Sequence, residues 1–286
     1  MTLATADSAS MISDADCEAF DRDGYLIKRG LFNDAEVELL QRALATDEAL
    51  QDSAFGLDDG YGGQTIVAVW NHPGDDTLGI VGRLPRIAGA CARLLGGEVY
   101  HYHSKITSKA PGGGGTWDWH QDYGYWYKNG LLFPNLASVA IAVSDLTEAN
   151  GTMRVLRGSH LCGRLEHAIM GGQNGADMER VGVLMQHLEE VSFIAEPGDA
   201  CFFHCNTLHT SAPNVSDRNR DLLLCCYNRA DNSPVVKHHH PFYTPLDVVD
   251  DDALLRTGLW SVGFERSFMD PATDISIGEF ETDPLS

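Results

Sequence analysis

Short apolar segments separated by turn residues fill the chain from residue 98 to residue 230, and they restrict the fold more than any other feature. Stretches such as Glu196-Pro197-Gly198-Asp199 are typical of tight turns, and β-branched and aromatic residues are concentrated between them. Short strands joined by turns are typical of a β-sandwich or barrel. We therefore expect a mostly β fold, with strands over residues 25–27, 99–108, 137–144, 153–156, 191–195, 200–204 and 221–228.

Helix signals are concentrated before this β-rich part. Two capping-box patterns predict helices that begin after Ser13 and after Asn33. A third helix is expected over Asp76–Leu95, and the glycine- and aspartate-rich residues 51–64 are expected to form a loop. No internal repeat or linker-like segment interrupts the chain, which favours one domain. The expected organisation is a flexible tail at 1–12 and a single domain at 13–286, made of a helical part (13–97), a β-rich core (98–230) and a C-terminal extension (231–286).

The charge of the chain excludes some classes of partner. The 286 residues include 41 acidic and 20 basic ones, which gives a formal net charge of -21. A field of this sign repels phosphate backbones and anionic lipids, so we expect a small-molecule substrate and neither nucleic acid nor a membrane as partner. The seven cysteines lack metal-site or disulfide-framework spacing, which indicates reduced thiols and a cytoplasmic location. No heptad pattern indicates an oligomeric state.

Two histidines and an aspartate form the strongest chemical signal. His120 and Asp122 are two residues apart, so on a strand both side chains would project from the same face. His209 follows far downstream in an apolar context, and Arg220 comes shortly after it. Two histidines with one carboxylate are the ligand set of non-heme Fe(II) oxygenases, which leaves coordination positions open. A lone His-x-Asp tripeptide is also common as a hydrogen-bonded surface pair, so the prediction of a metal site rests on the combined pattern.

These residues and several further motifs resemble the phytanoyl-CoA dioxygenase family, which includes ectoine hydroxylase and bacterial proline hydroxylases. The motifs that carry the resemblance run in order along most of the chain: Asp23-Gly24-Tyr25, Ser104-Lys105-Ile106, residues 119–123, Glu148-Ala149-Asn150-Gly151, Arg157-Gly158-Ser159-His160, residues 196–199, His209 and Arg220. The resemblance implies a double-stranded β-helix (jelly-roll, cupin-like) core over 98–230. It also implies an Fe(II)- and 2-oxoglutarate-dependent dioxygenase that uses O2.

The resemblance also implies roles for individual residues. The iron ligands would be His120, Asp122 and His209. The distal carboxylate of 2-oxoglutarate would be bound by Arg220, with Arg218 as the alternative, because a planar guanidinium binds a carboxylate bidentately. Three more positions match polar contacts near the co-substrate: Ser211, Thr107 and His103.

Aromatic residues crowd both sides of the metal motif, and they belong either to the core or to a substrate pocket. Two of them, Trp117 and Trp126, stand at the offsets from His120 at which ectoine hydroxylase has aromatic residues near its substrate. Lys105 precedes the motif on an expected strand and is a candidate partner for an anionic substrate. The candidate pocket residues are therefore Trp117, Tyr123, Trp126 and Lys105.

Three consecutive histidines, His238-His239-His240, form a further visible motif. They precede Pro241 and lack strand alternation, so we expect an exposed loop and not a second metal site.

The expected function is hydroxylation of an unactivated C–H bond of a small metabolite, with release of succinate and CO2. Candidate substrates are amino acids, amino-acid-like osmolytes and natural-product intermediates. Two alternatives remain open at this point. One is a β-helix protein that binds a ligand or metal without turnover, and the other is a cupin-type metalloprotein that uses no 2-oxoacid.

Overall fold

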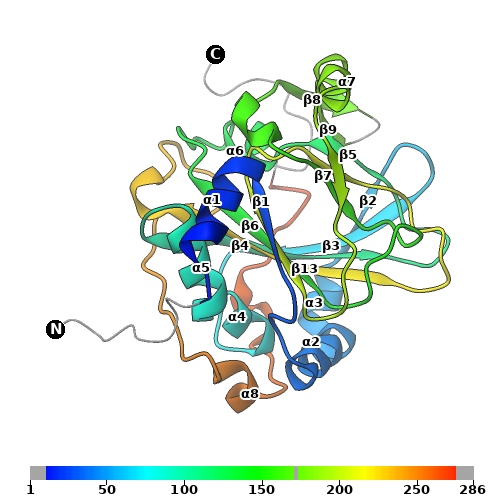
Figure 1. Cartoon of the computed structure of the whole chain (residues 1–286). Helices are drawn as coiled ribbons and strands as arrows, with labels where there is room; N and C mark the ends of the chain where they lie inside the picture. Colours follow the sequence, from blue (N-terminus) through cyan, green and yellow to red (C-terminus); the bar gives the residue numbers. More distant parts are fainter. Residues whose placement is uncertain (1–10, 171–172, 275–286) are drawn as a thin grey trace.

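Two antiparallel β-sheets and a hairpin form the framework of the protein (Figure 1). The computed structural model describes residues 11–170 and 173–274; residues 1–10 of the expected tail and 275–286 of the expected C-terminal extension lie outside the described residues. The larger sheet has the order β1 (Tyr25–Lys28), β11 (Ala200–His204), β6 (Leu136–Ala142), β13 (Arg220–Arg229), β4 (Val99–Lys109), β3 (Gln64–Trp70) and β2 (Phe55–Asp58). The smaller sheet has the order β10 (Glu190–Ser192), β7 (Met153–Leu156), β12 (His209–Ser211) and β5 (Trp117–His120), and the hairpin pairs β8 (His167–Met170) with β9 (Gln173–Ala176). The prediction of a mostly β fold with flanking helices is confirmed.

The seven-stranded sheet is buried on both faces, and alternate residues of β13 pack into two different hydrophobic clusters. Leu223 and Cys225 pack into a cluster with the helices, whereas Leu222 and Leu224 pack with residues of β7 and β10. This alternation follows from the two-residue period of a strand. The space between the two sheets is therefore closed by side chains of both, while helices cover the outer face of the larger sheet.

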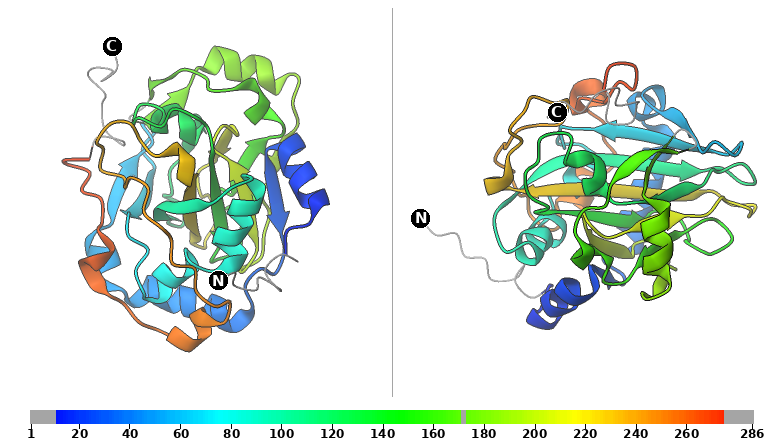
Figure 2. Two further views of the ribbon diagram at one scale, coloured as in Figure 1. Left: turned by 90° about the vertical axis from the view of Figure 1, so that its left-hand side faces the viewer. Right: turned by 90° about the horizontal axis from the view of Figure 1, so that it is seen from above.

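The helical layer is made of α1 (Asp14–Asp23), α2 (Asp34–Thr46), α3 (Glu48–Asp52), α4 (Thr77–Val81), α5 (Ala90–Leu94) and, from the C-terminal part, α8 (Ala253–Thr257). Figures 1 and 2 show α2, α4, α5 and α8 on the side of the larger sheet away from β5 and β7. Both predicted capping boxes are confirmed: Ser13 caps α1 and Asn33 caps α2, each bonding reciprocally with the third residue of its helix. No helix in the described residues is both long and apolar enough to cross a bilayer.

The prediction of one continuous helix over Asp76–Leu95 is wrong. The segment forms α4, a π-helical turn at Pro85–Gly89 and α5, with Leu84 in an extended conformation (ψ 139°). The cause is Pro85, whose ring disfavours a helical conformation at the preceding residue.

Residues 51–64 also differ from the prediction of a loop. The helix α3 extends into this range, and Phe55–Asp58 forms the edge strand β2 by pairing with β3, Phe55 opposite Val67. The local sequence is poor in strand-forming residues, so the neighbouring strand provides the order. Other elements are also absent from the prediction, among them the strand β3, the hairpin of β8 and β9, the helix α7 (Met178–Met185) and the short strand β12.

Arg266, in the 3-10 turn Gly263–Arg266, ties the C-terminal part of the chain to the helical layer. Its side chain is fully buried and forms ion pairs with Asp47 and with Asp76, whose Oδ2 lies 3.1 Å from Arg266 Nε. Removing one member of a buried ion pair leaves an uncompensated charge in the interior.

We expect Arg266→Met to lower the free energy of unfolding by about 3–5 kcal/mol, measured by urea denaturation. The matched control is Arg256→Met, because Arg256 lies on α8 and pairs with Asp250 and Asp252 at the exposed surface. Its expected effect is within about 0.5 kcal/mol. Equal losses in the two variants would show that the buried cluster has no special contribution to stability.

Candidate metal centre

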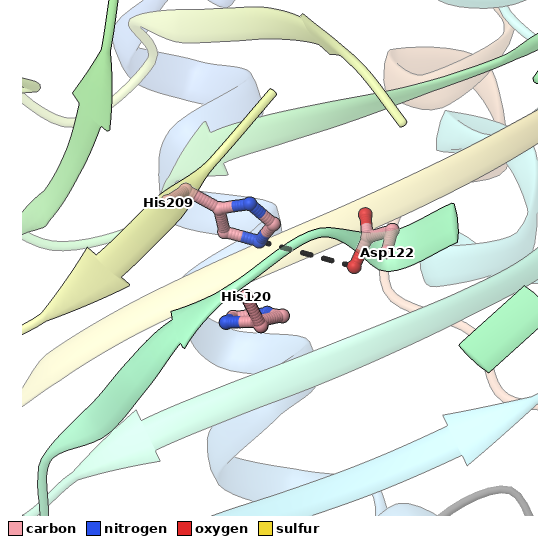
Figure 3. Close-up of side chains that lie close together, drawn as sticks. All are labelled: His120, Asp122 and His209. Atoms are coloured by element: carbon pink, nitrogen blue, oxygen red, sulfur yellow. Dashed lines mark ion pairs between the residues drawn. The ribbon is translucent and has the colours of Figure 1, made fainter. Parts of the chain in front are cut away.

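The three side chains predicted as metal ligands come together where β5 and β12 lie side by side (Figure 3). His120 is the last residue of β5, His209 is the first residue of β12, and the two are paired directly across the antiparallel ladder. Asp122 is the first residue of the short helix α6 (Asp122–Trp126). One potential ligand atom of each residue lies within 4.8 Å of the others, and all three side chains are buried. In the described part of the chain, no other group of His, Cys, Asp or Glu residues has this spacing.

The prediction that Asp122 projects from the same strand as His120 is wrong, because the chain leaves the strand between them. Gln121 is still extended (φ -115°, ψ 135°), and the helix begins at the next residue. The Gln121 side chain anchors this corner, since its Nε2 donates to the carbonyl oxygens of Gly163 (2.8 Å) and Asn206 (2.7 Å). The Asp122 carboxylate therefore approaches the histidines from the first turn of a helix.

Hydrogen bonds determine which nitrogen of each imidazole is available to a metal. His120 Nδ1 lies 2.7 Å from the carbonyl oxygen of Asp118, and His209 Nδ1 lies 2.9 Å from that of Thr207. A carbonyl oxygen can only accept, so both Nδ1 atoms carry the proton and both Nε2 atoms keep a lone pair. Burial lowers the pKa of both imidazoles, which favours the neutral form that binds metals.

Two hydroxyl groups hold the Asp122 carboxylate in place. Tyr125 donates from its hydroxyl to Oδ1 (2.7 Å), and Ser138 donates from Oγ to Oδ2 (2.9 Å). Oδ1 is also the oxygen that lies 3.8 Å from His209 Nε2. Tyr125 is three residues after Asp122 on the same helix, so its spacing could have identified it, whereas Ser138 comes from β6 and has no local signal.

We expect Tyr125→Phe to weaken Fe(II) binding by about 10–100-fold, because groups that orient a metal ligand have effects of this size. The measurement is an anaerobic Fe(II) titration. Tyr127→Phe is the control. Tyr127 is two residues after Tyr125, and its ring packs against Arg164. Unchanged iron affinity in Tyr125→Phe would mean that the hydroxyl does not orient the ligand.

The chemistry of this donor set fits Fe(II). Two neutral imidazole nitrogens and one carboxylate oxygen form the facial set of non-heme iron oxygenases. The carboxylate is already oriented by hydrogen bonds, and both histidines have the tautomer that frees Nε2. The residues present are thus suited to hold the ion without rearranging their hydrogen bonds.

A cavity between the two sheets begins at the two histidines and ends at Arg220 of β13. Its lining residues are Lys105, Thr107, Trp117, His120, Met153, His209, Thr210, Ser211, Arg220, Leu222 and Leu224. Arg220 is buried, and its Nη1 donates to Thr107 Oγ1 (2.9 Å). Burial lowers the pKa of Arg220 to about 10. Among the described residues, no carboxylate forms an ion pair with the Arg220 guanidinium. The other candidate, Arg218, has an exposed side chain that lies 3.4 Å from Asp145, away from this cavity.

Ser211 lines the same cavity, and its hydroxyl accepts a hydrogen bond from Lys109 of β4. Lys109 is fully buried, and its Nζ donates to Ser211 Oγ (2.7 Å) and to the carbonyl oxygen of Ala212 (2.7 Å). Burial lowers the pKa of Lys109 to about 6. Arg220 and Ser211 make this end of the cavity suited to an anion, and Lys109 orients the Ser211 hydroxyl from outside the lining.

The remaining candidates divide between the cavity and the core. Trp117 and Lys105 line the cavity, with the Lys105 ammonium 5.6 Å from the centroid of the Trp117 ring. Tyr123 and Trp126 instead belong to a buried aromatic cluster with Tyr100 and Tyr102, and neither is a lining residue. The Tyr123 hydroxyl donates to the carbonyl oxygen of Leu131.

His103 is buried beyond this cavity, in contact with one of the three consecutive histidines. Its ring is stacked on His240 (centroids 4.6 Å apart, 14° between planes). His240 is only 4% exposed, so the prediction of an exposed histidine loop is wrong at this residue. The reason is the packing of residues from the C-terminal part against β4, which no local pattern indicates.

Comparisons with known proteins support the family resemblance. A model of the phytanoyl-CoA dioxygenase (PhyH) family matches residues 20–222. L-proline trans-4-hydroxylase from Streptomyces griseoviridis is 29% identical over 257 residues, which cover 82% of this chain and 95% of the relative. The crystal structure of EctD from Sphingopyxis alaskensis with bound Fe has a TM-score of 0.67 and 25% identity to this chain. The match covers 91% of this chain and 88% of EctD. EctD with 2-oxoglutarate and 5-hydroxyectoine gives a TM-score of 0.70 at 22% identity, covering 86% and 90%.

Proposed function

The chain belongs to the phytanoyl-CoA dioxygenase family, and we propose that it hydroxylates an unactivated C–H bond of a small metabolite. It is an Fe(II)- and 2-oxoglutarate-dependent dioxygenase, and its products are succinate, CO2 and the oxidised substrate. The observation that carries the proposal is the arrangement of the cavity. His120 and His209 of the metal-ligand group lie on one side of the cavity, and on the other lies a buried guanidinium that has no acidic partner among the described residues.

The metal ligands and the polar residues near Arg220 have definite parts in this proposal. The Nε2 atoms of His120 and His209 and the Asp122 carboxylate would hold Fe(II). The Arg220 guanidinium, oriented by Thr107, would bind the distal carboxylate of 2-oxoglutarate, and the Ser211 hydroxyl would add a hydrogen bond.

Bound Fe(II) supplies the oxidation chemistry, in which one atom of O2 enters succinate as 2-oxoglutarate loses CO2 and the other enters the substrate. The protein positions the reactants and excludes water. The apolar side chains of Met153, Leu222 and Leu224 line the space between the anion-binding end and the metal centre. A dry cavity strengthens each electrostatic contact inside it.

Several finer expectations belong to the same proposal. We propose that the two sheets form a double-stranded β-helix core within a single domain over 13–286, with the helical part, core and C-terminal extension divided as the sequence predicts. The close packing of Arg266 against Asp47 and Asp76 supports one unit. The net charge of -21 supports an enzyme of small molecules with no nucleic-acid or membrane partner, and the seven free cysteines support a cytoplasmic location. His103 does not line the cavity, so any contact between His103 and 2-oxoglutarate would have to come from outside that lining.

The function is tested by succinate formation with purified protein, Fe(II) and 2-oxoglutarate over a panel of small metabolites. We expect succinate only when both Fe(II) and 2-oxoglutarate are present, and a visible charge-transfer band when the two are added without oxygen. Metal binding without succinate formation for any compound would favour the non-catalytic alternative. Metal-dependent conversion of a compound without 2-oxoglutarate would favour the cupin-type alternative.

A further inference from the structure

His167 is a buried histidine to which the proposed reaction assigns no part. It is the first residue of β8, and its side chain is 6% exposed. Its Nδ1 lies 3.0 Å from the carbonyl oxygen of Leu165. A carbonyl oxygen can only accept, so Nδ1 carries the proton and Nε2 keeps a lone pair. Burial lowers the pKa of His167 to about 4, so at neutral pH the uncharged imidazole is able to accept a hydrogen bond at Nε2.

The partner of that lone pair is the backbone between two metal ligands. The N–H group of Gln121 donates to His167 Nε2 over 2.9 Å. Gln121 separates His120 from Asp122, at the corner where β5 ends and α6 begins (Figure 3). The hydrogen bond therefore fixes the peptide group that follows one ligand and precedes the other.

The Gln121 side chain connects this corner to two further parts of the chain. Its Oε1 accepts from the backbone N–H of Leu165 (2.7 Å), and its Nε2 donates to the carbonyl oxygen of Gly163 (2.8 Å). The second Nε2 hydrogen bond goes to the carbonyl oxygen of Asn206 (2.7 Å), shortly before the third ligand, His209. The backbone segments that carry all three ligands are thus tied together through one residue.

The first turn of α6 also contacts the His167 ring. A Cβ atom added to Gly124 would lie 2.2 Å from Cε1 of His167, far closer than two carbon atoms approach without a bond. Glycine at this position is therefore what lets the imidazole reach the Gln121 N–H. Both nitrogens of His167 are already used in hydrogen bonds, so the residue is suited to hold the corner and not to bind the metal itself.

On the basis of the proposed function, we propose that His167 is a positioning residue of the metal centre, which fixes the backbone between the ligands His120 and Asp122. Without this acceptor, the buried Gln121 N–H would be left unpaired, and the corner would move to find another partner. The two ligands would then leave the spacing that brings them together with His209. Iron affinity would fall although every ligand is still present.

The test is an anaerobic Fe(II) titration of the wild type, His167→Leu and His167→Gln. Leucine has no acceptor, whereas the amide oxygen of glutamine is separated from Cα by the same number of bonds as Nε2 of histidine. We expect His167→Leu to weaken Fe(II) binding by about 10–100-fold. His167→Gln should stay within about threefold of the wild type.

The matched control is His101→Leu. His101 is also buried, and its two nitrogens form hydrogen bonds with Asn71 and Ser104, outside the ligand group. Its loss should lower the stability of the metal-free protein and leave the iron affinity unchanged. A loss of stability alone is thereby separated from a loss of ligand geometry.

Two further measurements examine the same contact. In the metal-free protein, amide hydrogen exchange reports on the Gln121 N–H directly, and it should be faster in His167→Leu than in the wild type or His167→Gln. Gly124→Ala approaches the contact from the helix and serves if His167→Leu does not fold. Its methyl group should displace the imidazole and weaken Fe(II) binding by about tenfold or more.

The role of His167 would be overturned by wild-type iron affinity in folded His167→Leu or in Gly124→Ala. Equal losses in His167→Leu and His167→Gln would also overturn it, because packing and not the acceptor would then matter. So would an equal loss in His101→Leu, or unchanged exchange of the Gln121 amide in His167→Leu. Failure of the proposed function is a separate result: the variants would rank as expected in iron affinity, and the wild type would form no succinate.

Discussion

The His209→Ala variant is expected to lose Fe(II) binding by about three orders of magnitude and to form no detectable succinate. Removing a ligand should exceed the roughly 10–100-fold effect of removing a group that only orients one. His209 is buried opposite His120, and no other histidine, cysteine or carboxylate of the described residues joins the group. The lost nitrogen therefore has no replacement. Anaerobic Fe(II) titration measures the affinity, and coupled succinate detection measures turnover.

The matched control is His187→Ala, because His187 is exposed and does not belong to the ligand group. Its iron affinity and turnover should equal those of the wild type. Circular dichroism of the metal-free proteins separates loss of a ligand from loss of the fold. Wild-type iron affinity in a folded His209→Ala protein would exclude His209 as a ligand.

Replacing Arg220 by methionine should raise the KM for 2-oxoglutarate by about 100-fold, equivalent to about 2.7 kcal/mol, while iron binding is retained. The guanidinium is buried, is oriented by Thr107 and has no acidic partner among the described residues. Burial lowers its pKa to about 10, which shows that its charge is unfavourable when no anion is bound. The 2-oxoglutarate-free variant should therefore be as stable as the wild type or more so, and only stabilisation by 2-oxoglutarate should disappear.

Arg218→Met provides the control for this experiment. Arg218 is two residues away, but its side chain is exposed and pairs with Asp145. Its removal should leave the KM for 2-oxoglutarate unchanged. An equal rise in both variants would remove the assignment of Arg220. A large loss of stability in 2-oxoglutarate-free Arg220→Met would indicate a structural role instead.

Local features of the fold were predictable where neighbouring residues decide the conformation. Ser13 and Asn33 cap their helices as predicted because the capping box is formed within four residues. The strand around Leu222–Leu224 was predictable because consecutive leucines fit a strand buried on both faces. The helix break at Pro85 is also local, and the helical periodicity around it concealed the signal.

Features that depend on distant segments were not predictable. The edge strand β2 exists because β3 pairs with it, and Asp122 lies on a helix because Gln121 is anchored by carbonyl groups from two other segments. Ser138 supports the Asp122 carboxylate from β6, and His240 is buried by contact with β4 residues. None of these contacts has a signature in the residues adjacent to the group concerned.

The residue types alone determined that this chain carries two imidazoles, a carboxylate and a guanidinium in an order typical of iron-dependent oxygenases, because ligand chemistry is a property of single side chains. Only the tertiary structure decided how the groups are used. Pairing of β12 with β5 places His209 beside His120, and the facing sheets leave Lys105 and Arg220 buried without acidic partners in the described chain. A buried charged side chain favours binding of an oppositely charged ligand when its surroundings leave the charge unpaired. Those surroundings come from segments far apart in the sequence.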